Sequence, residues 1–252
     1  MSTDRIALVT GAGSGIGRAA AIRLSQSGLR VVLASRGAGA LAATAAACPG
    51  PTLAIPADVT DPLAVDRLFS QAERDWGPVG VLVAGAGAGY SARIERTSDA
   101  DWYRMLELNL TAPFRCLRRA GPAMRARGYG RIVVIASTAS RIGEPYLAAY
   151  AASKHGVLGL VRAAAAELAG TGVTVNAVCP GFVDTPMTAA TIGNIAEKTG
   201  RTTGQARSAL EARQPIGRLI TPGEVADAVW FCVASEAITG QALNVDGGTV
   251  QS

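Results

Sequence analysis

The chain alternates between short apolar runs, rich in β-branched residues, and longer segments rich in alanine. Most of the short runs are apolar at every position, a pattern typical of strands that are buried on both faces of a parallel sheet. They predict strands at residues 6–10, 31–35, 52–57, 79–84, 132–136, 174–178 and 242–245. The longer segments predict helices between the strands, at residues 15–27, 37–47, 62–75, 99–127, 145–169 and 222–234.

This alternation predicts an α/β fold: a single-domain, Rossmann-like, doubly wound parallel sheet of seven strands with helices on both faces. No segment has the composition of a linker and no unit repeats, so we expect one domain over residues 1–252. Residues 185–217 depart from the alternation, because a long polar stretch follows a strand where a tight connection would suffice. Extra sequence after the carboxyl end of a strand is a common place for a lid, and we expect a substrate lid there.

Composition excludes several classes of protein. With 252 residues, 49% hydrophobic and 17% charged, the chain can form one substantial core and is not a disordered tail. Its longest apolar runs, such as residues 79–88, are short and rich in glycine, so no membrane-spanning helix is predicted. The sequence enters a strand without the charged and apolar parts of a signal peptide, and we expect a cytoplasmic protein. The cysteines lie far apart, so neither zinc nor a disulfide framework is expected.

The net charge of +5 raises the question of an anionic partner. The cations are almost all arginines, and they are scattered except for one local cluster at Arg118, Arg119, Arg125, Arg127 and Arg131. No stripe of aromatic residues accompanies them, so a nucleic-acid partner is not expected. Two interpretations stay open: a solvated surface, or a weak site for a phosphate-bearing carrier.

A glycine-rich loop follows the first predicted strand and precedes the first predicted helix. The generic dinucleotide pattern GxGxxG fails here, because Ile16 and Arg18 stand where it needs glycine. The pattern TGxxxGxG fits instead, with Thr10, Gly11, Gly15 and Gly17, and it encloses Ser14. Glycines let the backbone approach a pyrophosphate, and a helix N-terminus offers free N–H groups and partial positive charge. The loop therefore predicts a bound dinucleotide.

The end of the second strand bears on the choice of dinucleotide. An acidic residue there would bind the adenosine ribose diol, but the chain has Ser35 and Arg36 and no carboxylate. Arginine can pair with a 2′-phosphate and serine can donate a hydrogen bond to it, which favours NADP(H) over NAD(H). Arg36 could instead only stack on the adenine. After the third strand, Asp58 and Val59 are placed to contact the adenine, although Asp58 could equally cap the next helix.

Three residues form a candidate acid–base group. Tyr150 and Lys154 lie four apart in a predicted helix and so share one face, and Ser137 ends the fifth strand. A nearby ammonium favours the phenolate form, so we expect Lys154 to lower the pKa of Tyr150. Tyr150 could then exchange a proton with a carbonyl or alcohol oxygen that Ser137 also binds. Lys154 could in addition hold the cofactor ribose.

These motifs resemble the classical short-chain dehydrogenase/reductase family over the whole chain. The resemblance rests on TGAGSGIG at 10–17, Asn109 in LELNLT, Ser137 in IVVIAS, YAASK at 150–154, NAVCPGFVDT at 176–185 and ITGQALNVDGG at 238–248. It implies a catalytic tetrad of Asn109, Ser137, Tyr150 and Lys154, in which Asn109 supports a proton-relay water. It also implies a turn that packs near the nicotinamide, with Thr185 on the carboxamide and with Pro180, Gly181 and Val183 beside it.

One part of the chain departs from the family pattern. The family usually has Asn-Asn-Ala-Gly after the fourth strand, whereas here Ala84 and Gly85 are followed by Ala86 and Gly87. Small residues keep room for the cofactor, and Ala84 and Gly85, with Ile16 in the glycine loop, stay among the expected cofactor contacts. The hydrogen bonds of the two Asn side chains around the adenosine ribose are missing.

The resemblance also bears on substrate and assembly. The nearest groups are 3-oxoacyl thioester reductases, polyketide-type ketoreductases and 3-hydroxyacyl-CoA dehydrogenases, which implies reduction of a thioester on CoA or an acyl carrier protein. A free cyclic or steroid alcohol or ketone remains an alternative substrate. A lyase, an epimerase or a regulatory nucleotide-binding protein remains an alternative function.

Alanine-rich faces on the helices at 99–127 and 145–169 favour a homo-oligomer, a tetramer or dimer. The only histidine, His155, is expected to pack rather than to bind metal.

Overall fold

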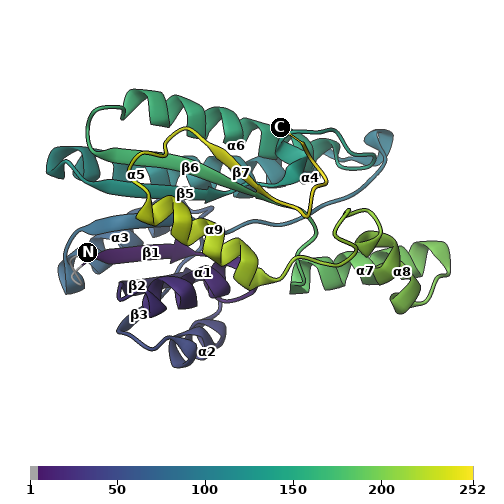
Figure 1. The fold of residues 1–252 in the computed structure, drawn as a ribbon, viewed down its shortest axis with the longest axis horizontal. Coiled ribbons are helices and arrows are strands. Elements are labelled where there is room, and N and C mark those ends of the chain that lie inside the picture. Colours follow the sequence, from purple (N-terminus) through teal and green to yellow (C-terminus); the bar gives the residue numbers. More distant parts are fainter. Residues whose placement is uncertain (1–4, 252) are drawn as a thin grey trace.

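The seven strands form one parallel sheet in the order β3-β2-β1-β4-β5-β6-β7 (Figure 1). The computed structural model describes residues 5–251. The strands are β1 (Ile6–Thr10), β2 (Arg30–Ser35), β3 (Thr52–Pro56), β4 (Val79–Ala84), β5 (Gly130–Ile135), β6 (Val173–Pro180) and β7 (Ala242–Val245). Every residue of β1, β4, β5 and β6 is buried, because helices cover both faces of the sheet. The predicted fold class is confirmed.

The helices form two layers. They are α1 (Gly15–Gln26), α2 (Ala38–Ala47), α3 (Pro62–Trp76), α4 (Asp99–Leu106), α5 (Ala112–Arg127), α6 (Ala148–Glu167), α7 (Pro186–Thr199), α8 (Thr203–Glu211) and α9 (Pro222–Ala234). One core packs α1, α2 and α9 on the sheet, through residues such as Leu24, Leu41 and Val229. The other packs α3, α5 and α6 on the opposite face, through residues such as Phe69 and Val157.

The order of the strands fixes where a ligand can bind. The chain moves outward from β1 to β2 and β3, and then returns to the other side of β1 to continue with β4. The connections after β1 and β4 therefore diverge, and they leave a crevice at the carboxyl ends of these two neighbouring strands. The glycine-rich loop and the Ala84–Gly87 segment lie at this crevice, because each directly follows one of the two strands.

Three predicted elements differ from the structure. The helix predicted at 99–127 is interrupted by a π-helical stretch, Glu107–Thr111, which separates α4 from α5. The helix predicted at 145–169 begins only at Ala148, after a short helical turn at Thr138–Ser140 and a loop. Residues 185–217, expected to interrupt the alternation, contain α7 and α8, which extend beyond the carboxyl ends of the strands (Figure 1). Within residues 5–251, no helix combines the length and the apolar character needed to cross a bilayer.

Candidate active site

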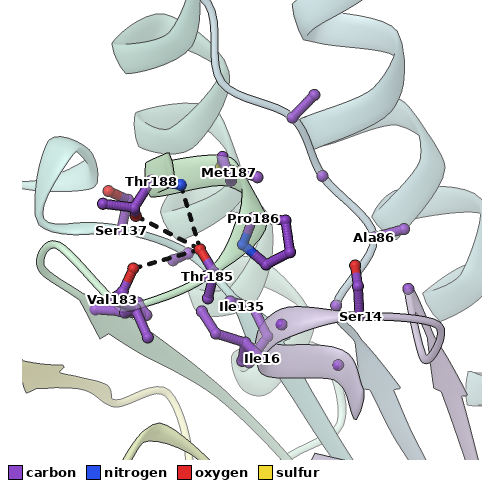
Figure 2. Close-up of a pocket in the computed structure, with 18 of the residues that line it drawn as sticks. Ser14, Ile16, Ala86, Ile135, Ser137, Val183, Thr185, Pro186, Met187 and Thr188 are labelled. Carbon is purple, nitrogen blue, oxygen red and sulfur yellow. Dashed lines mark hydrogen bonds between the residues drawn. The ribbon is translucent and has the colours of Figure 1, made fainter. Parts of the chain in front are cut away.

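One cleft lies at the crevice and has two connected parts. The inner part is lined by the glycine loop, the segment after β4, Ser137 and the turn after β6 (Figure 2). Tyr150 and Lys154 of α6 line it as well. The outer part is lined by the ends of β2 and β3, including Ser35, Arg36, Asp58 and Val59. Both parts share Gly11, Ser14, Ala86, Gly87 and Ala88, so the cleft is continuous and elongated. An elongated cleft of this kind suits a dinucleotide.

The glycine loop has the shape of a cradle. Gly11 has a φ of +70°, and a Cβ there would lie 2.8 Å from the Gly85 carbonyl oxygen, so only glycine fits. A Cβ at Gly17 would overlap the carbonyl of Gly11, and glycine lets the first turn of α1 pack against the loop. Within residues 5–251, no side chain caps the first turn of α1, and that turn carries no acidic residue. Its N–H groups therefore face the cleft free to bind an anion such as a pyrophosphate.

The outer part of the cleft carries Arg36 and Asp58 on the wall formed by the ends of β2 and β3. Arg36 is exposed and lines the wall with Ser35, and no carboxylate stands at the end of β2. Asp58, on the same wall, accepts hydrogen bonds from the N–H and the hydroxyl of Thr60, at 2.9 and 2.7 Å. These bonds lower the pKa of Asp58, and the nearby Arg36 lowers it further. Asp58 does not cap the next helix, because the cap of α3 is Asp61, whose carboxylate accepts from the Leu63 N–H at 2.8 Å.

Ser137, Tyr150 and Lys154 lie together on the inner part of the cleft. Ser137 follows β5, while Tyr150 and Lys154 are one turn apart on α6. The Lys154 ammonium is buried; it donates a hydrogen bond to the carbonyl of Ile135 at 2.8 Å and lies 5.9 Å from the centre of the Tyr150 ring. The carbonyl at the end of β5 therefore fixes the direction in which the lysine points. The three side chains that the sequence spacing brought together line the same part of the cleft.

The pKa of Tyr150 differs from the sequence-based expectation. Burial raises it, a hydrogen bond with Ser137 lowers it, and the negative charge of Glu144 raises it again. The expected lowering by Lys154 is not found, because loss of solvation dominates and the ammonium is directed at the Ile135 carbonyl. Burial also lowers the pKa of Lys154 to about 8. The neutral phenol is therefore the dominant form of Tyr150 at neutral pH, which suits a proton donor.

Asn109 lies behind the cleft wall rather than on it. It is 1% exposed and sits in the π-helical stretch between α4 and α5. Its side chain pairs with the backbone of Ala88, accepting from the N–H at 3.1 Å and donating to the carbonyl at 3.0 Å, and also donates to Ser153. A Cβ at Gly87 would lie 3.0 Å from its Oδ1. Asn109 thus connects the α4–α5 junction to the segment that lines the cleft after β4.

The turn after β6 closes the inner end of the cleft. Pro180, Gly181 and Val183 line the wall, and Thr185 caps α7 by accepting a hydrogen bond from the Thr188 N–H (Figure 2). A Cβ at Gly15, in the glycine loop, would lie 3.2 Å from the Thr185 side chain. Thr185, at the start of α7, therefore lies against Gly15 at the start of α1, and both residues line the cleft.

The sequence is similar to those of known proteins over nearly its whole length. The sequence model of the short chain dehydrogenase family matches residues 5–195. This chain is a short-chain dehydrogenase. It is 42% identical to a putative ketoacyl reductase of Streptomyces coelicolor, with 97% of each protein covered. It is 38% identical to the cis-4-hydroxycyclohexanecarboxylate dehydrogenase of Sinomonas cyclohexanicum, covering 97% of this chain and 96% of that protein.

A solved structure agrees with this assignment. A variant of actinorhodin polyketide ketoreductase, determined with NADPH, superposes with a TM-score of 0.94 at 40% identity, over 98% of both chains. Membership of the short-chain dehydrogenases makes the protein an NAD(P)-dependent oxidoreductase that acts on hydroxyl or keto groups. The resemblance stated from the sequence is confirmed.

Most predicted site residues of this short-chain dehydrogenase line the cleft, and a few do not. Thr10 and Ala84 are buried at strand ends behind the wall. The Thr10 hydroxyl accepts hydrogen bonds from the N–H groups of Gly85 and Ala86, at 3.1 and 3.3 Å, and so supports the segment that lacks the usual asparagines. His155 is exposed, and its Nδ1 lies 2.9 Å from the Ala151 carbonyl oxygen, so the predicted packing role is wrong.

Several residues on the wall of the cleft were not predicted from the sequence. Ile135 and Ala136 line the cleft at the end of β5, and Pro186, Met187 and Thr188 line it at the start of α7. Their positions follow from the strand ends and from Thr185 as a helix cap, signals that the sequence does carry. Asp184, beside Thr185, forms an exposed ion pair with Arg207 of α8, at 2.7 Å.

The buried Lys154 leads to a stability prediction for this short-chain dehydrogenase. Its pKa falls from 10.5 to about 8 on folding, so between these pH values the unfolded chain holds a proton that the folded chain has lost. The unfolding free energy must rise with pH across this window. Between pH 8 and 10.5, we expect the unfolding free energy of the wild type to rise by about 3 kcal/mol relative to that of Lys154→Met.

Urea unfolding at several pH values measures this difference. The other lysine, Lys198, is exposed on α7, and Lys198→Met is the matched control that should show no pH-dependent difference. If the difference in unfolding free energy between wild type and Lys154→Met stays constant from neutral pH to pH 10, burial does not lower the pKa of Lys154.

Proposed function

We propose that the protein is an NADP(H)-dependent ketoreductase whose acid–base group is Ser137, Tyr150 and Lys154. One observation carries the proposal: these three side chains line the same part of the cleft as the glycine loop. When bound, the dinucleotide supplies the hydride. The residues of the chain that would hold it are the glycine loop with Ser14 and Ile16, the segment at Gly85, and the turn from Pro180 to Thr185.

Each side chain has a task set by its surroundings. Tyr150, a neutral phenol, donates its proton to the carbonyl oxygen of the substrate during reduction, and it receives one from the alcohol in the reverse direction. Ser137 binds the same oxygen through its hydroxyl. Lys154, protonated below a pKa of about 8, stabilises the phenolate as it forms and holds the cofactor ribose. Asn109 acts from behind the wall, and its support of a relay water remains a prediction.

The preference for NADP(H) rests on the outer part of the cleft. Arg36 and Ser35 stand where an acidic residue would bind the ribose diol, and Asp58 is engaged by Thr60. A guanidinium forms charge-assisted hydrogen bonds with a 2′-phosphate, so the phosphorylated dinucleotide should bind better. The NADPH in the solved ketoreductase is consistent with this preference.

The preferred substrate class is a 3-oxoacyl thioester. This choice follows the names of the relatives, while the cyclohexanecarboxylate dehydrogenase supports a free cyclic alcohol as the second candidate. The arginine cluster does not strengthen the carrier hypothesis. Arg119 pairs with Glu73, Arg127 binds the Val79 carbonyl, and Arg131 is buried at the start of β5, at the end of the strand away from Ser137.

A substrate panel tests the proposed activity. Oxidation of NADPH at 340 nm is measured with 3-oxoacyl-CoA thioesters, their carrier-bound forms and cyclic ketones of similar size. We expect thioesters to give the highest kcat/KM. A preference for cyclic ketones would replace the thioester assignment, and no NADPH oxidation with any carbonyl compound would refute the ketoreductase.

The α7–α8 segment is proposed to be the substrate lid predicted at 185–217, in a single catalytic domain. It starts at the inner end of the cleft and contributes Met187 and Thr188 to the wall. An ion pair joins Arg207 of α8 to Asp184, which precedes α7. A lid in this position would exclude water from the reacting carbonyl and determine which substituents fit beside it.

A homo-oligomer is proposed to form through the outer faces of α5 and α6. A groove between these helices is lined by apolar side chains such as Phe114, Leu117 and Leu160. Ala163, exposed in this groove, should tolerate only a small side chain at an interface. We expect Ala163→Arg to convert a dimer or tetramer to smaller species in sedimentation experiments, whereas Ala43→Arg on exposed α2 should not. An unchanged mass for Ala163→Arg would remove this face from the interface.

A further inference from the structure

The lid segment leaves and rejoins the body of the protein at one narrow neck. The chain departs through the turn after β6, at residues 180–184, and returns through residues 214–220. Two backbone hydrogen bonds join the two sides: the Ile220 N–H donates to the Phe182 carbonyl at 2.9 Å, and the Asp184 N–H donates to the Ile220 carbonyl at 2.8 Å. One of these two sides also lines the cleft, through Gly181 and Val183.

A glutamine side chain fills this neck. Gln214 is 1% exposed, although its side chain is polar. Its Oε1 accepts a hydrogen bond from the Phe182 N–H at 2.8 Å, and its Nε2 donates to the Phe182 carbonyl at 3.1 Å and to the Arg218 carbonyl at 2.7 Å. The amide thus pairs with both backbone groups of Phe182, as a neighbouring strand would.

The turn is shaped to receive this amide. A Cβ at Gly181 would overlap the Gln214 Oε1, so glycine there makes room for the side chain. On its other side, the Gly181 N–H donates to the Val245 carbonyl of β7 at 3.0 Å. The turn is therefore held between β7 and Gln214, and removing the amide would leave the half-buried Phe182 N–H without its acceptor.

We propose that Gln214 is a positioning residue that sets the depth of the Gly181–Val183 turn in the cleft, and through it the affinity for the nicotinamide half of the dinucleotide. The inference rests on the proposed function, because it takes the cleft as the dinucleotide site with its nicotinamide end at this turn. Gln214 is absent from the wall of the cleft and acts only through Phe182 and its neighbours.

The geometry gives a readout that loss of stability alone would not produce. The turn lies at the inner end of the cleft, while Arg36 and Ser35 lie at the outer end. A displaced turn should weaken binding of NADPH and leave binding of 2′,5′-ADP, which lacks the nicotinamide half, unchanged. A general loosening of the protein should weaken both ligands.

The experiment measures both dissociation constants by calorimetry for wild type and Gln214→Met, which keeps the side-chain length but not the hydrogen bonds. We expect the Kd of NADPH to rise about tenfold, since two hydrogen bonds to the turn are lost, while the Kd of 2′,5′-ADP changes less than twofold. Gln205→Met is the matched control, because Gln205 makes its hydrogen bond at the exposed start of α8, and it should change neither constant.

The outcomes are distinct. Equal weakening of both ligands, or no weakening of either, would overturn the role of Gln214. If the Met variant does not fold, Gln214→Asn replaces it, because a shorter amide cannot reach both Phe182 and Arg218 and should give the same selective loss. If wild type binds neither ligand, the dinucleotide site itself is wrong, which is a failure of the proposed function.

Discussion

Tyr150→Phe should lower kcat for ketone reduction by about a thousandfold while leaving the affinity for NADPH unchanged. The variant removes one hydroxyl from the cleft wall and keeps the ring that packs there. Because the phenol is the proposed proton donor, and the Lys154 ammonium is directed at the Ile135 carbonyl, the loss should appear in kcat. Steady-state kinetics at saturating NADPH and titration of NADPH fluorescence measure the two quantities.

The matched control is Tyr103→Phe, which removes the same hydroxyl from an exposed tyrosine on α4. It should retain wild-type rates. A Tyr150→Phe enzyme with more than a tenth of the wild-type kcat would show that another group supplies the proton, and the acid–base assignment would have to be abandoned.

Arg36→Asp should reverse the preference between the two dinucleotides. The substitution removes the guanidinium that would pair with the 2′-phosphate and places a carboxylate where one would bind a ribose diol. Loss of a charge-assisted contact and the added repulsion together correspond to about 3 kcal/mol, or roughly a hundredfold fall in the kcat/KM for NADPH relative to NADH. The measurement is kcat/KM for both dinucleotides with one ketone.

Arg201→Asp makes the same change of charge at an exposed position between α7 and α8, outside the outer part of the cleft. It should leave the NADPH-to-NADH ratio unaltered. If Arg36→Asp also leaves the ratio unaltered, Arg36 does not contact the phosphate, and its alternative role of stacking on the adenine is favoured.

The strands and the position of the cleft were predictable because they depend on local signals. Runs that are apolar at every position define buried parallel strands, and the glycine loop defines the carboxyl end of β1. The break in the helix at 99–127 was not predictable in this way. It accompanies hydrogen bonds between Asn109 and Ala88, two residues that are distant in sequence and meet only in the folded chain.

In the candidate site, too, features set by local sequence were predictable, and features set by contacts of the folded chain were not. The spacing of Tyr150 and Lys154 predicted that both lie on one face of a helix, and both are on α6 and line the cleft. The pKa of Tyr150 was predicted in the wrong direction, because it depends on burial by the surrounding elements and on the Ile135 carbonyl that orients Lys154. Gln214 gave no signal in the sequence, since its hydrogen bonds form only where the two ends of the α7–α8 segment meet in the folded chain.

The most direct test of the account is the transfer of label from NADPH carrying deuterium at C4 of the nicotinamide. The reduction is run in ordinary water with the best ketone or thioester of the panel, and the product alcohol is analysed by mass spectrometry. If the cleft brings the dinucleotide to the carbonyl beside Tyr150, deuterium from one face of the ring must appear on the carbinol carbon. An alcohol without deuterium from either face of the labelled dinucleotide would contradict hydride transfer in this cleft.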